Sequence, residues 1–276
     1  MSPTWQPLIL AVAPNGAYKT KADHPHLPMT AHELAESAAA CLDAGATMIH
    51  LHVRDAGGRH SLDADAYEAA TAAIRRAVGD RVVVQMSSEA AGRFAPEQQM
   101  ASVRAVRPEA VSIGLREIAT EAVPERTLAD FFQWLADTEI MTQVILYSVT
   151  DVHRWQELRR RGMIPEWPYF VLFVLGRYAA EQTSSPSDLL AFLNADDGAY
   201  PWAMCAFGRL EHACVMAAAA SGGHVRVGFE NNLYLPDGSL AADNAALVTH
   251  AADAARVLGR PLADASAVRR LFSRGG

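Results

Sequence analysis

A short apolar run, Met48-Ile49-His50-Leu51-His52-Val53-Arg54-Asp55, carries two histidines and ends in charged residues. Its apolar residues are nearly continuous rather than alternating, which is typical of a strand in a parallel sheet whose faces are both covered. A strand points alternate side chains to the same face, so His50 and His52 would converge from a rigid backbone. An isolated His-x-His pair more often lines a packed interior than binds a metal, so its meaning depends on the rest of the chain.

Runs of this kind alternate with Ala-rich stretches of helical spacing along the whole chain. The predicted strands are residues 8–13, 48–53, 82–87, 110–115, 142–147, 169–175, 202–207 and 224–229. The predicted helices are residues 31–44, 64–78, 96–106, 127–137, 151–161, 186–193, 211–221 and 244–258. Thr30 and Asp63 are suitable N-caps, and Gly45, Gly79 and Gly162 stand where helices should end.

Eight β–α units in about 250 residues fit a closed (β/α)8 barrel of the TIM type, an α/β fold. A doubly wound open sheet is the alternative, but no predicted strand leads into the Gly-x-Gly-x-x-Gly turn that binds dinucleotides in such sheets. We therefore predict one barrel domain over residues 1–276, in which residues 259–276 form a C-terminal extension with a short helix near 266–272.

Composition excludes several classes of function. The 276 residues are 50% apolar and 20% charged with a net charge of −7, and no block of Lys or Arg offers the basic surface that nucleic acid requires. No apolar run approaches the ~20 residues that span a bilayer, and the N-terminus does not resemble a signal peptide. Cys41, Cys205 and Cys214 are odd in number and lie in apolar surroundings, so we expect buried thiols and a cytoplasmic protein.

Polar residues gather at the carboxyl ends of the predicted strands, where a β–α barrel carries its chemistry. The residues at these ends are Asn15, Tyr18, His50, His52, Arg54, Ser87, Ser88, Glu89, Arg116, Glu117, Tyr147, Arg226, Glu230 and Asn231. Barrel closure would place the second and eighth strands beside the first, so that His50, His52 and Glu230 can meet. Two imidazoles and one carboxylate, with coordination left open, form a common catalytic site for zinc or ferrous iron.

Two arginines in this set allow more than one interpretation. Arg54 could clamp a substrate, or it could pair with Asp55 to anchor a loop. Arg226 alternates with Val225 and Val227 and would point into the barrel, where an unpaired guanidinium is costly. For Arg226 we therefore favour a functional role over a structural ion pair.

Three motifs resemble the β-keto acid cleavage enzyme family. They are His50-Leu51-His52-Val53-Arg54-Asp55, Phe173-Val174-Leu175-Gly176 and Gly222-Gly223-His224-Val225-Arg226-Val227-Gly228-Phe229-Glu230. The similarity extends over nearly the whole chain, from Leu8 to Leu262. It implies a zinc-containing barrel, often a homotetramer, with Zn²⁺ held by His50, His52 and Glu230.

The resemblance also implies an acyltransferase that condenses a β-keto acid with acetyl-CoA and cleaves the adduct to acetoacetate and a new acyl-CoA. Arg226 matches the family arginine that stabilises oxyanions and binds carboxylate, a task suited to the planar guanidinium. Ser87 matches a serine that holds the substrate carboxylate. We predict further substrate contacts for Asn15, Tyr18, Arg54 and Ser88.

The chain departs from the family pattern at two positions. Asn231 stands where the family usually has an aspartate that is implicated in proton transfer, and an amide cannot act as a base. We expect Asn231 to orient Arg226, while Glu89 or Glu117 takes over as the base, or the metal and Arg226 suffice. Tyr18 lies where a family member that acts on an amino-substituted substrate has a glutamate that recognises the ammonium group. Tyr18 carries no such charge, so we expect a β-keto acid with a neutral R group.

Three alternatives stay open from the sequence. The barrel could carry a metal-dependent aldolase or hydrolase that needs no CoA. It could also be a silent metal-binding protein that has lost its base at Asn231. The ligand set suits iron or manganese as well as zinc.

Overall fold

Eight parallel strands close into a barrel in the computed structural model of the chain, which describes residues 5–273. The strands are β1 (Leu10–Val12), β2 (Met48–Leu51), β5 (Val83–Ser87), β6 (Ala110–Gly114), β7 (Met141–Leu146), β8 (Phe170–Leu175), β9 (Trp202–Ala206) and β10 (His224–Val227). Closure occurs at β1, which pairs with β2 on one side and with β10 on the other. The predicted barrel is therefore confirmed, and the open sheet is excluded.

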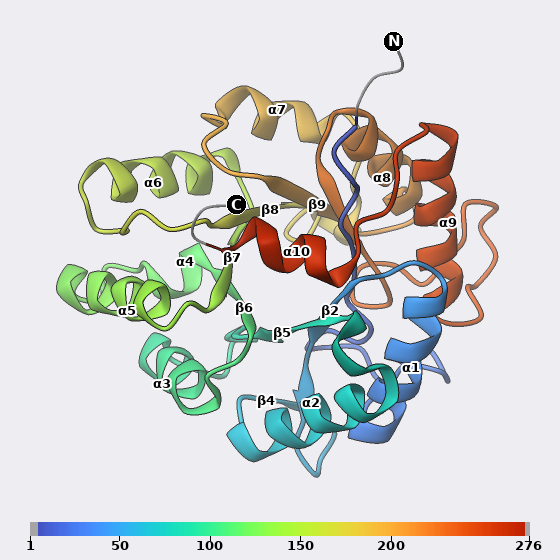
Figure 1. The fold of residues 1–276 in the computed structure, drawn as a ribbon, viewed down its shortest axis with the longest axis horizontal. Helices are drawn as coiled ribbons and strands as arrows, with labels where there is room; N and C mark the ends of the chain where they lie inside the picture. The colour runs from blue at the N-terminus through green and yellow to red at the C-terminus, as the bar shows by residue number, and fades with distance from the viewer. Residues whose placement is uncertain (1–4, 274–276) are drawn as a thin grey trace.

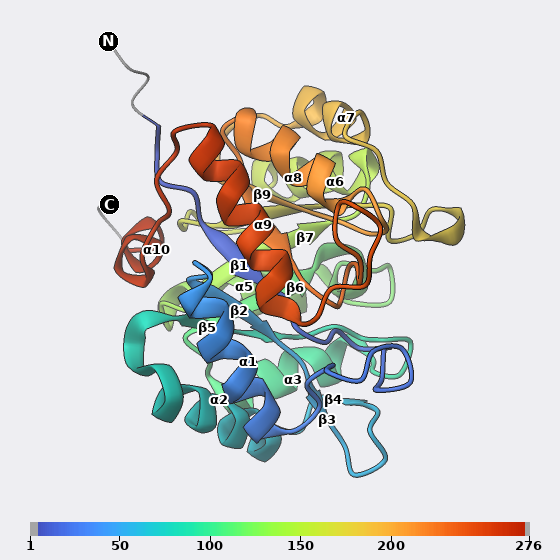
Figure 2. The same cartoon turned by 90° about the vertical axis from the view of Figure 1, so that its right-hand side faces the viewer.

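Helices surround the barrel, and Figures 1 and 2 show them as an outer layer around the strands. The main helices are α1 (Ala31–Asp43), α2 (Ala64–Val78), α3 (Pro96–Val106), α5 (Glu125–Asp137), α6 (Val149–Arg160), α7 (Asp188–Ala195), α8 (Glu211–Ala220) and α9 (Asn244–Val257). Local signals set their ends as predicted. Thr30 forms a capping box with Glu33, Asp63 accepts a hydrogen bond from the amide of Ala66, and Gly79 ends α2 with a φ of 61°.

Several short elements differ from the prediction. The strand expected over residues 48–53 ends at Leu51, and the chain continues into an antiparallel hairpin of β3 (Val53–Arg54) and β4 (His60–Ser61). Asp55 forms the turn, because its side chain accepts hydrogen bonds from the amides of Gly57 and Arg59. The structure also adds α4 (Leu115–Ile118) and two 3-10 turns, η1 (Gly79–Arg81) and η2 (Ala180–Gln182).

The predicted C-terminal helix, α10 (Ala265–Leu271), closes the amino-terminal end of the barrel. In Figure 1 it lies across the middle of the barrel. Val268 and Phe272 are buried with the side chains of the barrel interior, and the ring of Phe272 lies 5.7 Å from that of Phe170. Because α10 covers this end, the carboxyl end of the strands is where a ligand would enter the part of the barrel that residues 5–273 form.

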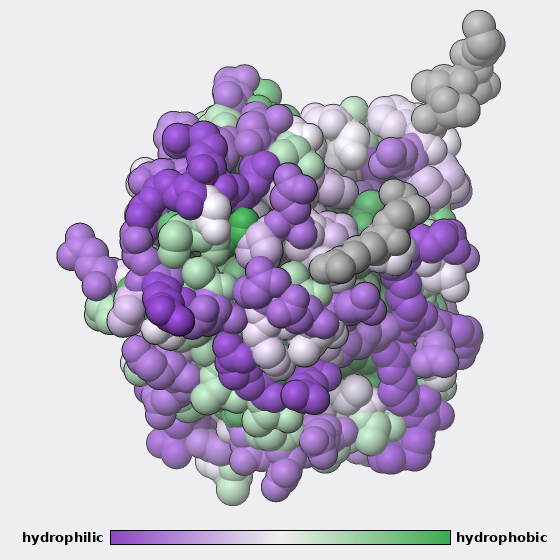
Figure 3. Space-filling model, turned by 60° about the vertical axis from the view of Figure 1, so that its left-hand side comes forward, coloured by the Kyte–Doolittle hydropathy of each residue, from purple (hydrophilic) through white to green (hydrophobic). Residues whose placement is uncertain are grey.

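Polar side chains cover most of the face drawn in Figure 3, and the apolar areas between them are small. Among residues 5–273, no helix is long and apolar enough to span a membrane. Cys41, Cys205 and Cys214 are buried free thiols, as predicted from their surroundings.

Candidate active site

The structure brings His50, His52 and Glu230 together at the carboxyl end of the barrel. His50 lies on β2, His52 follows it, and Glu230 follows β10, so the three flank the short strand β1. The Nε2 atoms of the two histidines are 3.0 Å apart, and Oε2 of Glu230 lies 3.6 Å from that of His50 and 3.4 Å from that of His52. One potential ligand atom from each residue therefore lies within 4.8 Å of the others.

The hydrogen bonds around these residues fit a cation. Nδ1 of His50 lies 2.8 Å from Oε1 of Gln85, an acceptor, so this nitrogen carries the proton and Nε2 is left with a free lone pair. Burial lowers the pKa of His50 to about 4 and that of His52 well below its usual value, which favours neutral imidazoles. Oε2 of Glu230 is buried without a hydrogen-bond partner. Two neutral imidazoles and an unsatisfied carboxylate oxygen suit a divalent metal ion.

His60 adds a contact that sequence reasoning missed. It is buried on β4, and its Nδ1 lies 3.3 Å from Nδ1 of His52. Its Nε2 is 2.9 Å from the carbonyl oxygen of Glu89. These contacts fix the orientation of the His52 ring. The hairpin that carries His60 has no clear hydrophobic pattern in the sequence, so the contact could not be predicted.

The loop after β1 packs directly against Glu230. A Cβ atom built on Gly16 would lie 2.5 Å from Cγ of Glu230, so only glycine fits there. The φ of Gly16 is +61°, a backbone conformation that also favours glycine. Lys19 donates a hydrogen bond of 2.7 Å from Nζ to the carbonyl oxygen of Glu230. The glutamate is therefore held by both its backbone and its side chain.

Arg226 reaches the same point from β10 and is almost fully buried. Its Nη2 donates to Oε1 of Glu230 at 2.9 Å, to Oδ1 of Asn231 at 3.4 Å and to Sγ of Cys205 at 3.2 Å. Burial alone would lower the pKa of Arg226, but Cys205 and Glu230 raise it above its usual value, so the group stays charged. Nε and Nη1 have no hydrogen-bond partner. These two donors are free to bind an anion.

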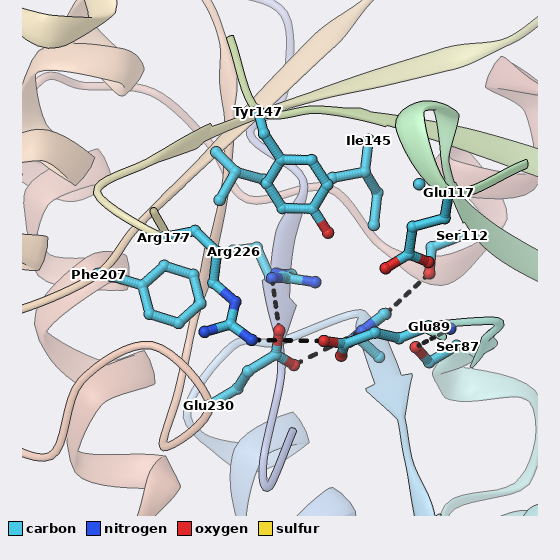
Figure 4. Close-up of a pocket in the computed structure, with 13 residues that line it drawn as sticks. Ser87, Glu89, Ser112, Glu117, Ile145, Tyr147, Arg177, Phe207, Arg226 and Glu230 are labelled. Atoms are coloured by element: carbon cyan, nitrogen blue, oxygen red, sulfur yellow. Dashed lines mark hydrogen bonds and ion pairs between the residues drawn. The ribbon is translucent and has the colours of Figure 1, made fainter. Parts of the chain in front are cut away.

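Figure 4 shows the cavity beside these groups and the residues that line it. Its lining consists of His50, Ser87, Glu89, Ser112, Gly114, Glu117, Ile145, Tyr147, Val174, Arg177, Phe207, Arg226 and Glu230. The cavity therefore combines charged groups near Glu230 with apolar and aromatic walls.

Two predicted carboxylates, Glu89 and Glu117, face this cavity. Burial, followed by the charges of Glu230 and Glu117, raises the pKa of Glu89 to about 7. Its Oε1 lies 3.5 Å from Nη2 of Arg177. Burial also raises the pKa of Glu117, whose Oε2 accepts hydrogen bonds from the amide of Ala90 at 3.0 Å and from Nε2 of Gln99 at 2.8 Å.

The five predicted substrate-binding residues differ in position. Ser87 lines the cavity. The hydroxyl of Ser88 donates instead to the carbonyl oxygen of Ser112 at 2.8 Å and does not face the cavity. Tyr18 is 58% exposed, and the guanidinium of Arg177 lies 4.8 Å from the centre of its ring. Tyr18 therefore stands at the rim.

Asn15 and Arg54 hold the loop after β1 in place. Nδ2 of Asn15 donates to the carbonyl oxygens of Pro28 and His52, each at 3.0 Å. Arg54 donates to the carbonyl oxygens of residues 16, 17 and 19. Of the two interpretations of Arg54, the ion pair with Asp55 is not found among the described residues, because Asp55 pairs with Arg59 instead. Neither Asn15 nor Arg54 is among the residues that line the cavity.

Arg177 and Glu211 are charged residues near the site that sequence reasoning did not select. Arg177 follows β8, and the rule that chemistry gathers at strand ends could have found it. Glu211 is buried at the start of α8, and its carboxylate accepts hydrogen bonds from the side-chain amides of Asn231 and Asn232. In the sequence, Glu211 is the first residue of a predicted helix, and this position did not indicate a contact with the site.

Comparisons with known proteins agree with this geometry. A family model described as beta-keto acid cleavage enzyme matches residues 7–273. The chain is 28% identical to the 3-keto-5-aminohexanoate cleavage enzyme of Fusobacterium nucleatum, over 96% of this chain and 97% of that protein. It is also 28% identical to the 3-oxoadipate:acetyl-CoA acetyltransferase of Cupriavidus necator, over 97% and 95% of the two chains. The solved complex of ObcA with oxaloacetate is similar in fold, with a TM-score of 0.72 at 18% identity over 90% of this chain and 67% of that one.

Proposed function

The chain belongs to the beta-keto acid cleavage enzyme family, and from this premise we propose that it transfers an acyl group from a β-keto acid to CoA. The β-keto acid and acetyl-CoA would react to give acetoacetate and a new acyl-CoA. One observation carries this proposal. Within residues 5–273, His50, His52, Glu230 and the two free donors of Arg226 meet at the end of the barrel opposite α10.

The proposed reaction exchanges two acyl groups. Loss of an α-proton makes the carbon between the keto and carboxylate groups a nucleophile, which attacks the acetyl thioester and releases the CoA thiolate. The thiolate then adds to the original keto carbon. Cleavage of the adjacent carbon–carbon bond leaves acyl-CoA and expels acetoacetate, whose carbanion takes up a proton. Every atom of the two substrates is recovered in the two products.

Residues of the cavity can be assigned to the binding of the substrate and of the metal in this reaction. Nε and Nη1 of Arg226 would bind the substrate carboxylate or the enolate oxygen, because they are charged donors without a partner. Ser87, at the cavity wall, would hold the other carboxylate oxygen. We propose Zn²⁺ as the metal that His50, His52 and Glu230 bind, and when bound it would polarise the keto acid as a Lewis acid. Metal analysis of purified protein tests its identity.

We propose Glu89 or Glu117 as the group that removes the α-proton, since Asn231 cannot. Both carboxylates line the cavity, and the backbone and Gln99 fix only one oxygen of Glu117. The variants Glu89→Gln and Glu117→Gln separate them, because loss of the base removes the corresponding limb of the pH–rate profile. Profiles that are unchanged in both variants would exclude both residues.

We propose a substrate with a neutral R group. Ile145, Tyr147 and Phe207 give the cavity apolar and aromatic walls, and Glu89, the carboxylate nearest Arg177, is engaged in an ion pair with it. Competition between neutral β-keto acids and 3-keto-5-aminohexanoate is the direct test. Preference for the amino compound would refute this part of the proposal.

A second cavity offers a place for acetyl-CoA. Its lining includes Lys19, Arg209, Asn231 and Tyr234, and Asn231 is hydrogen-bonded to Arg226 of the catalytic cavity. Arg209 could meet a CoA phosphate, since its guanidinium lies at the surface over the ring of Tyr234. The variant Arg209→Gln should raise KM for acetyl-CoA and leave KM for the keto acid unchanged.

The deciding experiment is a screen of β-keto acids with and without acetyl-CoA on protein of verified metal content, with acyl-CoA products measured by mass. Products that form without acetyl-CoA would indicate an aldolase or hydrolase. Absence of both turnover and α-proton exchange would indicate a silent metal-binding protein. We further propose a cytoplasmic homotetramer in which one barrel domain with its extension from residue 259 carries the whole activity, and light scattering tests the tetramer.

A further inference from the structure

Glu211 is a buried carboxylate that lies just behind the catalytic cavity. It is 2% exposed, and none of its atoms lines that cavity. Its Oε1 accepts a hydrogen bond of 3.3 Å from Nδ2 of Asn231, and its Oε2 accepts one of 3.2 Å from Nδ2 of Asn232. Among the described residues no cation forms an ion pair with Glu211. Such a group is costly to bury, since burial raises its pKa to about 8.

The contacts of Asn231 connect Glu211 to Arg226. An asparagine amide can be turned by 180°, which exchanges its donor and its acceptor. Here Nδ2 faces two acceptors, Oε1 of Glu211 and the carbonyl oxygen of Arg226, both at 3.3 Å. Oδ1 must then face Nη2 of Arg226, at 3.4 Å. Oε1 of Glu211 and the carbonyl oxygen of Arg226 therefore both favour the amide orientation in which Asn231 accepts a hydrogen bond from the guanidinium.

The orientation of Arg226 depends on the same contact. Nη2 is placed between Glu230, Asn231 and Cys205, and this fixes the plane of the guanidinium and the direction of the two free nitrogens. If the amide of Asn231 turned over, its NH2 group would face the cationic Nη2. The guanidinium would then have to move away from Asn231, and Nε and Nη1 would move with it.

We propose that Glu211 is a positioning residue that, through the amide of Asn231, holds Arg226 in the orientation that binds the substrate. This inference rests on the proposed function. The position of Glu211 at the N-terminus of α8 does not explain why it is buried, because a carboxylate at the surface could interact with the helix dipole there. Its buried oxygens instead meet the side-chain amides of the two residues that follow the metal ligand Glu230.

An exchange of acid and amide tests the proposal. Glu211→Gln keeps one acceptor oxygen but sets an NH2 group against the amide of Asn231 or of Asn232, so kcat should fall by about 10- to 100-fold, the range for loss of a contact that supports a metal site, while KM for acetyl-CoA is unchanged. Asn231→Asp sets two carboxyl groups against each other and should also lower kcat. The double variant Glu211→Gln/Asn231→Asp restores one acid and one amide to the pair and should recover most of the lost kcat. Glu157→Gln, on the exposed surface of α6, is the matched control.

A double-mutant cycle in the free energy of unfolding gives a readout that needs no substrate. The two single variants should each lose stability, and the double variant should lose less than their sum. Additive losses would overturn the proposal, and so would recovery of stability without recovery of kcat. A wild-type protein that turns over no β-keto acid would refute the proposed function, whereas the unfolding cycle would still decide whether Glu211 and Asn231 act as a pair.

Discussion

Replacement of Arg226 by lysine should lower kcat/KM strongly without removing the metal. Lysine can keep the ion pair with Glu230, but its single nitrogen cannot also supply the two donors, Nε and Nη1, that have no partner among residues 5–273. A hydrogen bond to a charged group contributes about 1.5–3 kcal/mol. Two lost donors should therefore cost about 3–6 kcal/mol, or roughly 10²- to 10⁴-fold in rate.

The assay compares Arg226→Lys with the wild type on the β-keto acid that the screen identifies as the best substrate. Acyl-CoA formation gives kcat and KM, and metal analysis of the same samples shows whether His50, His52 and Glu230 still hold the ion. Arg256→Lys, on an exposed arginine of α9, is the control for arginine loss in general. A loss of less than tenfold at full metal content would refute the assignment of the two free donors to the substrate.

Other perturbations address the metal centre and the barrel. Removal of the metal by a chelator should abolish turnover, and zinc should restore it; full activity in the stripped protein would contradict a metal-dependent reaction. Gly16→Ala should lower metal affinity by about 10- to 100-fold, because its Cβ would lie 2.5 Å from Cγ of Glu230, and titration of the apoprotein with zinc measures this. Nδ1 of His224 accepts the amide of Ile9 at 2.9 Å, and burial lowers its pKa from 6.5 to about 3. The unfolded chain therefore binds a proton first as the pH falls below 6.5, and this site should lower the free energy of unfolding by about 2 kcal/mol between pH 7.5 and pH 5. His224→Gln should remove that part of the pH dependence in urea unfolding, and an unchanged slope would contradict it.

The sequence predicts the barrel because its signal is periodic and repeated. Continuous apolar runs alternate with amphipathic stretches, and Thr30 and Asp63 cap helices where expected. The meeting of His50, His52 and Glu230 follows from the same reasoning, because closure of a parallel barrel brings the first and last strands together. Periodicity and topology are thus sufficient for the fold and for the candidate ligands.

Side chains beyond the strand ends are less predictable. Arg54 and Ser88 both stand at strand ends, yet each bonds to backbone carbonyl groups away from the cavity. Glu211 and His60 contact the site from a helix and a hairpin, and no local pattern reveals either contact. Their positions depend on how loops fold back over the barrel, and this is decided by tertiary contacts rather than by local spacing.

The position of the site across β1 has a consequence for biosynthesis. His50 and His52 leave the ribosome early, but Glu230 emerges only after some 180 further residues, and it reaches them when β10 docks on β1. A nascent chain therefore carries two imidazoles that lack their carboxylate partner while these intervening residues are translated. We expect the ion to be captured late, after the ring of strands has been completed.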